Sequence, residues 1–78
     1  MPEQVPIRGE TIRLGQLLKL AGVVASGSEV KPMLAEEQVQ INGRTETRRG
    51  RQLHAGDTVS VGERELRLVA AATGAQPG

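Results

Sequence analysis

Four arginines lie within eight positions of one short segment, INGRTETRRGRQL at residues 41–53, and they define the chemistry open to this chain. They are Arg44, Arg48, Arg49 and Arg51. A guanidinium group binds phosphate oxygens through paired hydrogen bonds, and each neutralised phosphate releases counterions. Gly50 allows backbone turns that other residues resist. The segment is therefore a candidate phosphate-binding loop, with an ordinary solvated hairpin loop as the alternative.

Charge is concentrated in this segment. The whole chain has a net charge of only +1, whereas residues 44–55 hold four arginines and a single acid, Glu46, for a local balance of +3. Whole-chain charge therefore says little about a partner, while the local excess favours an anionic one.

Composition argues against several other functions. The 78 residues make one small domain with no cysteine and a single histidine, His54, so neither a metal site with the usual ligand count nor a nucleophile–base pair can be assembled. We expect no enzyme activity, no cofactor, no metal and no small-molecule substrate. No apolar run approaches the roughly 20 residues of a membrane span, and MPEQVPIRG is not typical of a secretion signal. A cytoplasmic protein without a membrane partner is the expectation.

The elements that must position the arginines can be read from periodicity. Residues 1–9 and 71–78 are expected to be flexible tails around a folded domain at residues 10–70. Ile12 and Leu14 alternate with polar residues, which predicts a short strand. Helical spacing of the apolar residues then predicts a helix over residues 14–21, ended by Gly22.

A second helix is predicted to run to about residue 36. SGSE at residues 26–29 fits a capping box of Ser26 and Glu29, and Ser28 is a second possible cap. With Ser26 as the cap, Pro32 would kink the helix. With Ser28 as the cap, Pro32 falls nearer the tolerated first turn, which we favour.

The rest of the chain alternates with a period of two. Strands are predicted around Val39–Ile41, Val59–Val61 and from Leu66 to Ala70, with tight turns at Asn42–Gly43 and before the last two strands. The predicted class is α+β, with two short helices packed on a small antiparallel sheet of three to four strands.

These elements together resemble the S4 RNA-binding domain, which has an αL-like fold. The resemblance runs from Ile12 to Val61, through RLGQLLKLAGVVASGSEVKPMLAEEQVQING and then GDTVSV. SGSEVK and ETRRGRQL are closest to the short stand-alone bacterial S4-like proteins, which carry SGGEAK and RRGRKL segments. The sequence departs from the wider family at Gly15 and Gly27, where many S4 domains have Asp and Arg, and at Glu37, which replaces a glycine.

The resemblance implies RNA binding through the helix pair and the adjoining strand and loop. The expected RNA-binding residues are Arg13, Lys19, Ser26, Lys31, Asn42, Arg44, Arg48, Arg49 and Arg51. For Lys19 and Lys31 a solvated helix face is an equal alternative, and Asn42 is first of all a turn residue.

The absence of Phe, Tyr and Trp narrows the mode of binding. Proteins that bind single-stranded RNA usually stack its bases on aromatic rings, and each stacked base contributes about 1–3 kcal/mol of binding free energy. We therefore expect a structured RNA, recognised through phosphates, riboses and shape. Ribosomal RNA, free or in the ribosomal particle, is the candidate by analogy. The rivals are a protein-interaction module that docks on an acidic ribosome-associated partner, and a DNA-binding protein.

Overall fold

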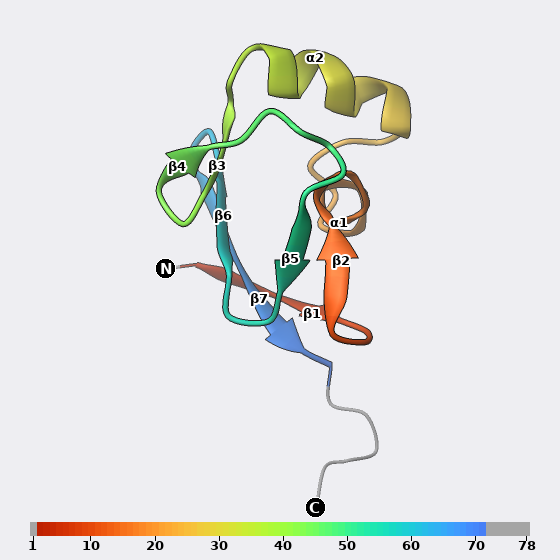
Figure 1. Ribbon diagram of the computed structural model, residues 1–78, viewed down its shortest axis with the longest axis vertical. Coiled ribbons are helices and arrows are strands. Elements are labelled where there is room, and N and C mark those ends of the chain that lie inside the picture. The colour runs from red at the N-terminus through yellow and green to blue at the C-terminus, as the bar shows by residue number, and fades with distance from the viewer. Residues whose placement is uncertain (1, 72–78) are drawn as a thin grey trace, which may run out of the picture.

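The computed structural model describes residues 2–71, and its helices and strands are arranged as in Figure 1. The elements are β1 Glu3–Ile7, β2 Thr11–Arg13, α1 Leu14–Leu20, a 3-10 turn Gly27–Glu29, α2 Val30–Ala35, β3 Val39–Ile41, β4 Arg44–Thr45, β5 Gln52–His54, β6 Thr58–Val61 and β7 Arg64–Ala70. Five strands form a sheet in the order β1-β7-β6-β3-β4, and β2 pairs with β5 in a separate ribbon. The α+β class is confirmed, but the sheet has more strands than the three or four predicted and is only mostly antiparallel, since β1 and β7 pair in parallel.

The first strand corrects the expected tail at residues 1–9. β1 pairs in parallel with β7, so that Val5 lies opposite Leu68 and Ile7 opposite Ala70. Val5 and Ile7 are buried, and Pro6 between them lies on an edge strand, where a missing N–H is tolerated. The alternation of buried and exposed residues in β1 is short and contains Pro6, and the partner strand β7 lies at the other end of the chain, so periodicity did not predict β1. Of the expected tail at residues 71–78, all but the first residue lies outside the described part of the chain.

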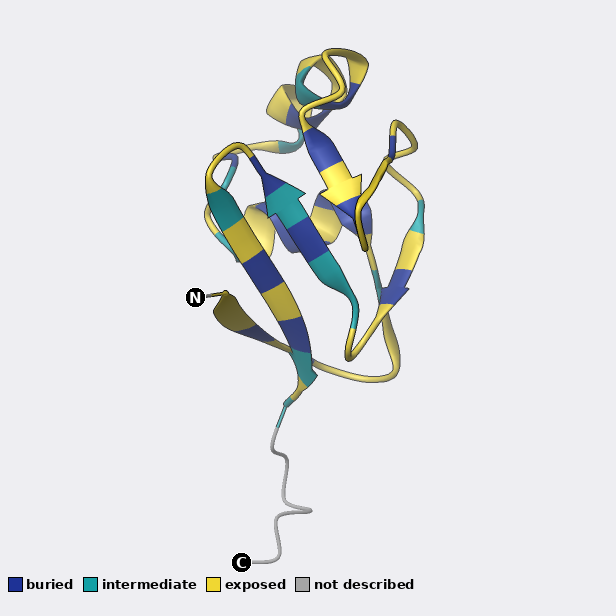
Figure 2. Ribbon diagram, turned by 90° about the vertical axis from the view of Figure 1, so that its left-hand side faces the viewer, coloured by how far each residue is buried: buried dark blue, intermediate teal, exposed yellow. Residues whose placement is uncertain are grey.

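The core is entirely aliphatic, and α1 supplies its centre. Leu14, Leu17 and Leu18 are fully buried, on the helix face that their spacing predicted. The sheet contributes alternate residues, and in Figure 2 dark blue and yellow alternate along β7, the strand that leads to the C-terminal end. No helix in the described residues has the length and apolar character to cross a membrane.

The ribbon of β2 and β5 joins the start of α1 to the arginine segment. The short strand predicted around Ile12 is confirmed as β2, and Ile12 lies opposite the buried Leu53 of β5. The sequence did not predict β5 or this pairing, because each strand is only three residues long. The pairing brings residues 48–51 next to the first turn of α1.

The second helix begins differently from the predicted capping box. The Glu29 carboxylate accepts a hydrogen bond from the N–H of Ala25 (2.9 Å), and the hydroxyls of Ser26 and Ser28 bond to each other (2.9 Å). Ser26, at the N-cap of the 3-10 turn, makes no capping bond through its side chain. The N-cap of α2 is Glu29, so the predicted cap at Ser28 is wrong. α2 starts at Val30, so Pro32 falls in its first turn, where proline is tolerated.

The helix ends at a strained residue. The N–H of Glu37 donates to the Leu34 carbonyl (2.9 Å) and that of Gln38 to the Met33 carbonyl (3.3 Å), which is a Schellman motif. Glu37 adopts a φ of 57°, in the left-handed region that glycine favours. This is the position where the S4 resemblance leads one to expect glycine.

We predict that Glu37→Gly stabilises the protein by about 1 kcal/mol, because it relieves the left-handed strain. Chemical denaturation measures the change in the free energy of unfolding. Glu36→Gly is the matched control, since Glu36 has a φ of −88° and gains nothing from glycine. An unchanged or lower stability of Glu37→Gly would contradict the strain at this position.

Candidate nucleic-acid interface

Residues 46–51, here called the arginine loop, are organised around one buried carboxylate. The side chain of Glu46 is only 9% exposed. Its Oε2 atom accepts hydrogen bonds from the backbone N–H groups of Thr47 (3.1 Å) and Arg48 (3.0 Å) and from Nε of Arg48 (3.1 Å). Its Oε1 atom accepts one from Nη1 of Arg51 (2.7 Å). One acid therefore fixes the path of the loop and two of its arginines.

These contacts hold Glu46 in its charged form. The side-chain and backbone hydrogen bonds from Arg48, helped by Arg51, lower the pKa of Glu46 to about 2, against the opposing effect of burial. Glu46 in turn raises the pKa of Arg48. The group is thus an ion-paired cluster at neutral pH.

The arginine loop also caps α1 with its backbone. The carbonyl of Arg51 accepts a hydrogen bond from the N–H of Leu14 (2.9 Å), and the carbonyl of Arg49 accepts one from Gly15 (3.0 Å). N–H groups in the first turn of a helix have no partner within the helix, so these bonds satisfy two of them. The position of the loop is therefore fixed to the helix.

The side chain of Arg49 lies across two glycines. A Cβ atom placed on Gly15 would lie 3.8 Å from Nε of Arg49, and one on Gly27 would lie 3.7 Å from Nη2. The side chain therefore reaches from the start of α1 to the 3-10 turn before α2. Larger residues at either glycine would compete with Arg49 for this space.

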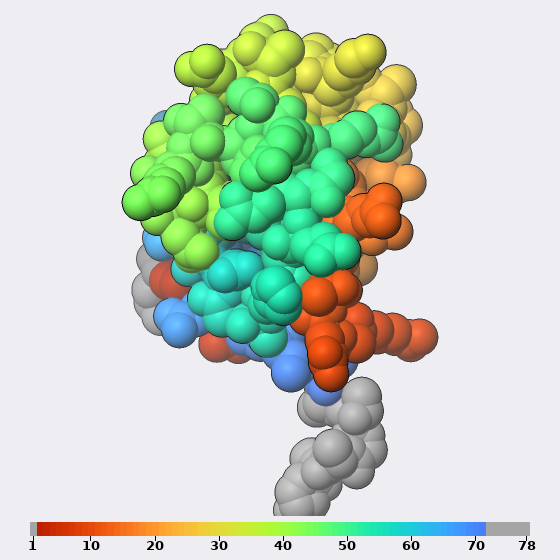
Figure 3. Space-filling model, in the orientation of Figure 1, coloured from red at the N-terminus to blue at the C-terminus, as the bar shows by residue number. Residues whose placement is uncertain are grey.

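Three shallow hollows surround the arginine loop, which lies on the face toward the viewer in Figure 3, in green, between α2 in yellow and β2 in orange. The first, beside α2, is lined by Lys31, Leu34, Thr47 and Arg49. The second, beside α1, is lined by Arg13, Gly15, Gln16, Arg49 and Gly50. The third is lined by Arg48, Gly50, Arg51, Gln52, His54 and Asp57. Since Arg49 lines the first two hollows and Gly50 the last two, they form one continuous face.

The hollows differ in charge. The two that share Arg49 have no acidic residue in their linings, and among residues 2–71 Arg13, Lys31 and Arg49 form no ion pair. Their positive charge is available to an anion from outside the protein.

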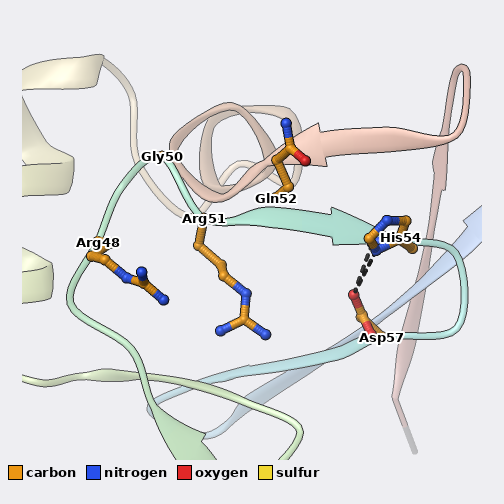
Figure 4. Close-up of a pocket in the computed structure, with 6 residues that line it drawn as sticks. All are labelled: Arg48, Gly50, Arg51, Gln52, His54 and Asp57. Carbon is orange, nitrogen blue, oxygen red and sulfur yellow. Dashed lines mark hydrogen bonds and ion pairs between the residues drawn. The ribbon is translucent and has the colours of Figure 1, made fainter.

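The third hollow is partly neutralised. In Figure 4 the guanidinium groups of Arg48 and Arg51 extend to the same side of the loop, and His54 lies farther along, paired with Asp57. Burial alone would raise the pKa of Asp57, but hydrogen bonds from the His54 backbone N–H (2.8 Å) and the Asn42 amide (3.2 Å) outweigh it and lower that pKa. Asp57 is therefore an anion inside this hollow.

The structure brings five of the predicted residues onto this face, namely Arg13, Lys31, Arg48, Arg49 and Arg51. Ser26 lies next to Gly27, with its hydroxyl bonded to Ser28. Lys19 lies in the last turn of α1 and Arg44 on β4, and neither lines a hollow of the arginine loop.

Asn42 has a structural role. Its φ is 52° and that of Gly43 is 86°, as the predicted tight turn between β3 and β4 requires. Its amide donates to Asp57 and accepts from the N–H of Thr58 (2.9 Å). Both ends of the amide are thus engaged within the protein.

Sequence reasoning missed Glu46 and the two glutamines, Gln16 and Gln52, that line the hollows. A signal for Glu46 was present, because it is the only acid among the arginines of residues 44–55. Its burial depends on the fold of the loop, which spacing alone does not reveal.

Comparison with known proteins gives consistent matches. An S4 domain family model matches residues 5–69. The chain is 44% identical over 61 residues to "Probable ribosome maturation protein RlbA" of Bacillus subtilis, a match covering 78% of this chain and 86% of that protein. It is 41% identical over 59 residues to "Putative RNA-binding protein YbcJ" of Escherichia coli, covering 76% and 84%. A Burkholderia lata tyrosine–tRNA ligase is 36% identical over 73 residues, covering 88% of this chain but only 18% of the ligase.

The low pKa of Glu46 predicts a stability loss in acid. A carboxyl group whose pKa is lowered by folding contributes stability that is complete above its ordinary value of 4.5 and is lost as the pH falls toward about 2. We expect the difference in melting temperature between the wild type and Glu46→Gln to be largest above pH 5 and to shrink between pH 4.5 and 2. Thermal unfolding followed by circular dichroism measures it. A difference that stays constant over this range would contradict the ion-paired cluster.

Proposed function

Because the chain belongs to the S4 domain family, we propose that it is a non-catalytic protein that binds structured RNA through the face built around the arginine loop. The names of its short relatives, one a ribosome maturation protein and one an RNA-binding protein, support RNA as the partner class. Ribosomal RNA is the RNA that we propose.

The observation that carries this proposal is the pair of acid-free hollows on either side of Arg49. Arg13 lines one hollow and Lys31 the other, so three cations from separate segments converge on one surface. Backbone phosphates are spaced charges, and a protein that neutralises several of them needs cations spread along a face. This arrangement fits a phosphate backbone better than a single small anion.

Arg48 and Arg51 extend the face even though Glu46 binds them. The side chain of Arg48 is 74% exposed and that of Arg51 is 39% exposed. A guanidinium has five N–H donors, and Glu46 occupies only part of each set. The remaining donors are open to phosphate oxygens.

The mode of recognition follows from composition and shape. The chain has no aromatic residue on which bases could stack. Double-stranded RNA is recognised mainly by shape and by contacts to phosphates and 2′-hydroxyls. Selection would therefore depend on the fold of the RNA more than on its sequence.

We predict that Arg49→Ala weakens binding about tenfold at 0.1 M salt and lowers the log–log salt slope by about one unit, because one phosphate contact is lost. Fluorescence anisotropy of a labelled structured ribosomal RNA fragment, titrated at several salt concentrations, measures both. Arg67→Ala is the matched control, since Arg67 is exposed on β7 outside the three hollows. Equal effects of the two variants would argue for unspecific charge attraction.

Replacing Arg48, Arg49 and Arg51 together by Ala should lower the salt slope by roughly two to three units. Binding that this variant retains unchanged would remove the arginine loop from the interface. If the wild type also failed to bind RNA at low salt, the rival protein-interaction module would take its place.

A comparison of duplexes separates RNA from DNA as the partner. An RNA duplex should bind more tightly than a DNA duplex of the same sequence at the same salt, because only RNA offers 2′-hydroxyls and A-form geometry. Competition between the unlabelled duplexes and the labelled fragment measures the ratio. Preference for the DNA duplex would favour a DNA-binding protein.

A further inference from the structure

We propose that Glu46 is a positioning residue for RNA binding, an acid that strengthens the attraction of this face for a polyanion by holding its arginines in place. The inference rests on the proposed function and assigns a part in RNA binding to an acidic residue. It starts from the contacts of a single carboxylate with two guanidinium groups and two backbone N–H groups.

Glu46 orients the guanidinium groups of both arginines. Arg48 turns Nε and Nη2 toward Glu46, at 3.1 and 3.5 Å, so its Nη1 edge faces away from the carboxylate. Arg51 uses Nη1, at 2.7 Å, which leaves Nε and Nη2. Each arginine therefore keeps donors for a phosphate while its rotamer is already fixed.

Ordering an arginine side chain during binding costs conformational entropy. A free arginine has many rotamers, and fixing one of them on binding opposes association. Glu46 fixes these side chains before the RNA arrives, so less order has to be created in the complex. Preorganised donors bind more tightly than mobile ones with the same charge.

Glu46 also fixes the loop segments on both sides of Arg49. The bonds to Thr47 and Arg48 set the start of the arginine loop, and the bond to Arg51 sets its end. Between these fixed points the carbonyl of Arg49 binds the N–H of Gly15, and its side chain lies against Gly15 and Gly27. The same carboxylate therefore supports the arginine between the two acid-free hollows.

Removing Glu46 has two effects on RNA binding, and they have opposite signs. Loss of a negative charge beside the RNA would tighten binding if only net charge mattered. Loss of the fixed arginines would weaken it. We expect the weakening to prevail, because the Glu46 side chain is buried and its charge is already compensated by two guanidinium groups.

The experiment uses three variants of the full chain and the labelled ribosomal RNA fragment. Glu46→Gln removes the charge and places an amide donor against the arginine donors. Glu46→Asp keeps the charge but shortens the side chain, so it tests reach alone. Glu65→Gln is the matched control, because it removes an acid that is exposed on β7 outside the hollows.

We expect Glu46→Gln and Glu46→Asp to bind about tenfold more weakly at 0.1 M salt, because their arginines must then be ordered during binding. Glu65→Gln should bind as the wild type does or slightly more tightly. A variant that was only less stable would show a smaller active fraction in a stoichiometric titration but an unchanged Kd for its folded molecules. The active fraction therefore separates positioning from a loss of folding.

A second measurement does not depend on RNA. The Nε–H signal of Arg48 in a nitrogen–proton NMR spectrum should be protected from exchange in the wild type and lose that protection in Glu46→Gln. If the wild type binds the RNA and Glu46→Gln binds it equally well or more tightly, the positioning role of Glu46 is overturned while the proposed function stands. Failure of the wild type to bind any structured RNA would overturn the proposed function and, with it, this role of Glu46.

Discussion

Like-charged guanidinium groups on one short loop repel each other unless a counter-charge lies among them, and Glu46 supplies that charge here. Its carboxylate bonds to Arg48 and Arg51 and to the backbone between β4 and β5. A buried charge is stable only when it is paired and hydrogen-bonded, and this one satisfies both conditions. These bonds and the backbone bonds to α1 together set the path of the arginine loop.

That path links the candidate interface to the core. The carbonyls of Arg49 and Arg51 satisfy the first N–H groups of α1, and Leu14, one of the donors, is itself fully buried. The loop is therefore part of the fold and not an appendage to it. A small aliphatic core has modest stability, and the parallel pairing of β1 with β7 adds the buried Val5 and Ile7 to it.

The sequence predicted what depends on near neighbours. Helix α1, the turn at Asn42–Gly43 and the strands β3, β6 and β7 were predictable because their signals repeat within a few residues. Pairing between distant segments was not, so β1 was mistaken for a tail and the partner of β2 was missed. The arginine cluster was evident in the sequence. Which of its arginines form ion pairs depends on Glu46, and the burial of Glu46 is evident only in the fold.

Two glycines, Gly15 and Gly27, lie beside a cation that comes from another segment of the chain. Many S4 domains have an arginine where this chain has Gly27, so that position itself offers no cation. The structure nevertheless places Nη2 of Arg49 where it would lie 3.7 Å from a Cβ on Gly27, and Nε of Arg49 where it would lie 3.8 Å from a Cβ on Gly15. A guanidinium from the arginine loop thus occupies the space beside both glycines. Absence of the side chains expected at these two positions does not by itself indicate loss of the positive surface, because Arg49 places a guanidinium beside both of them.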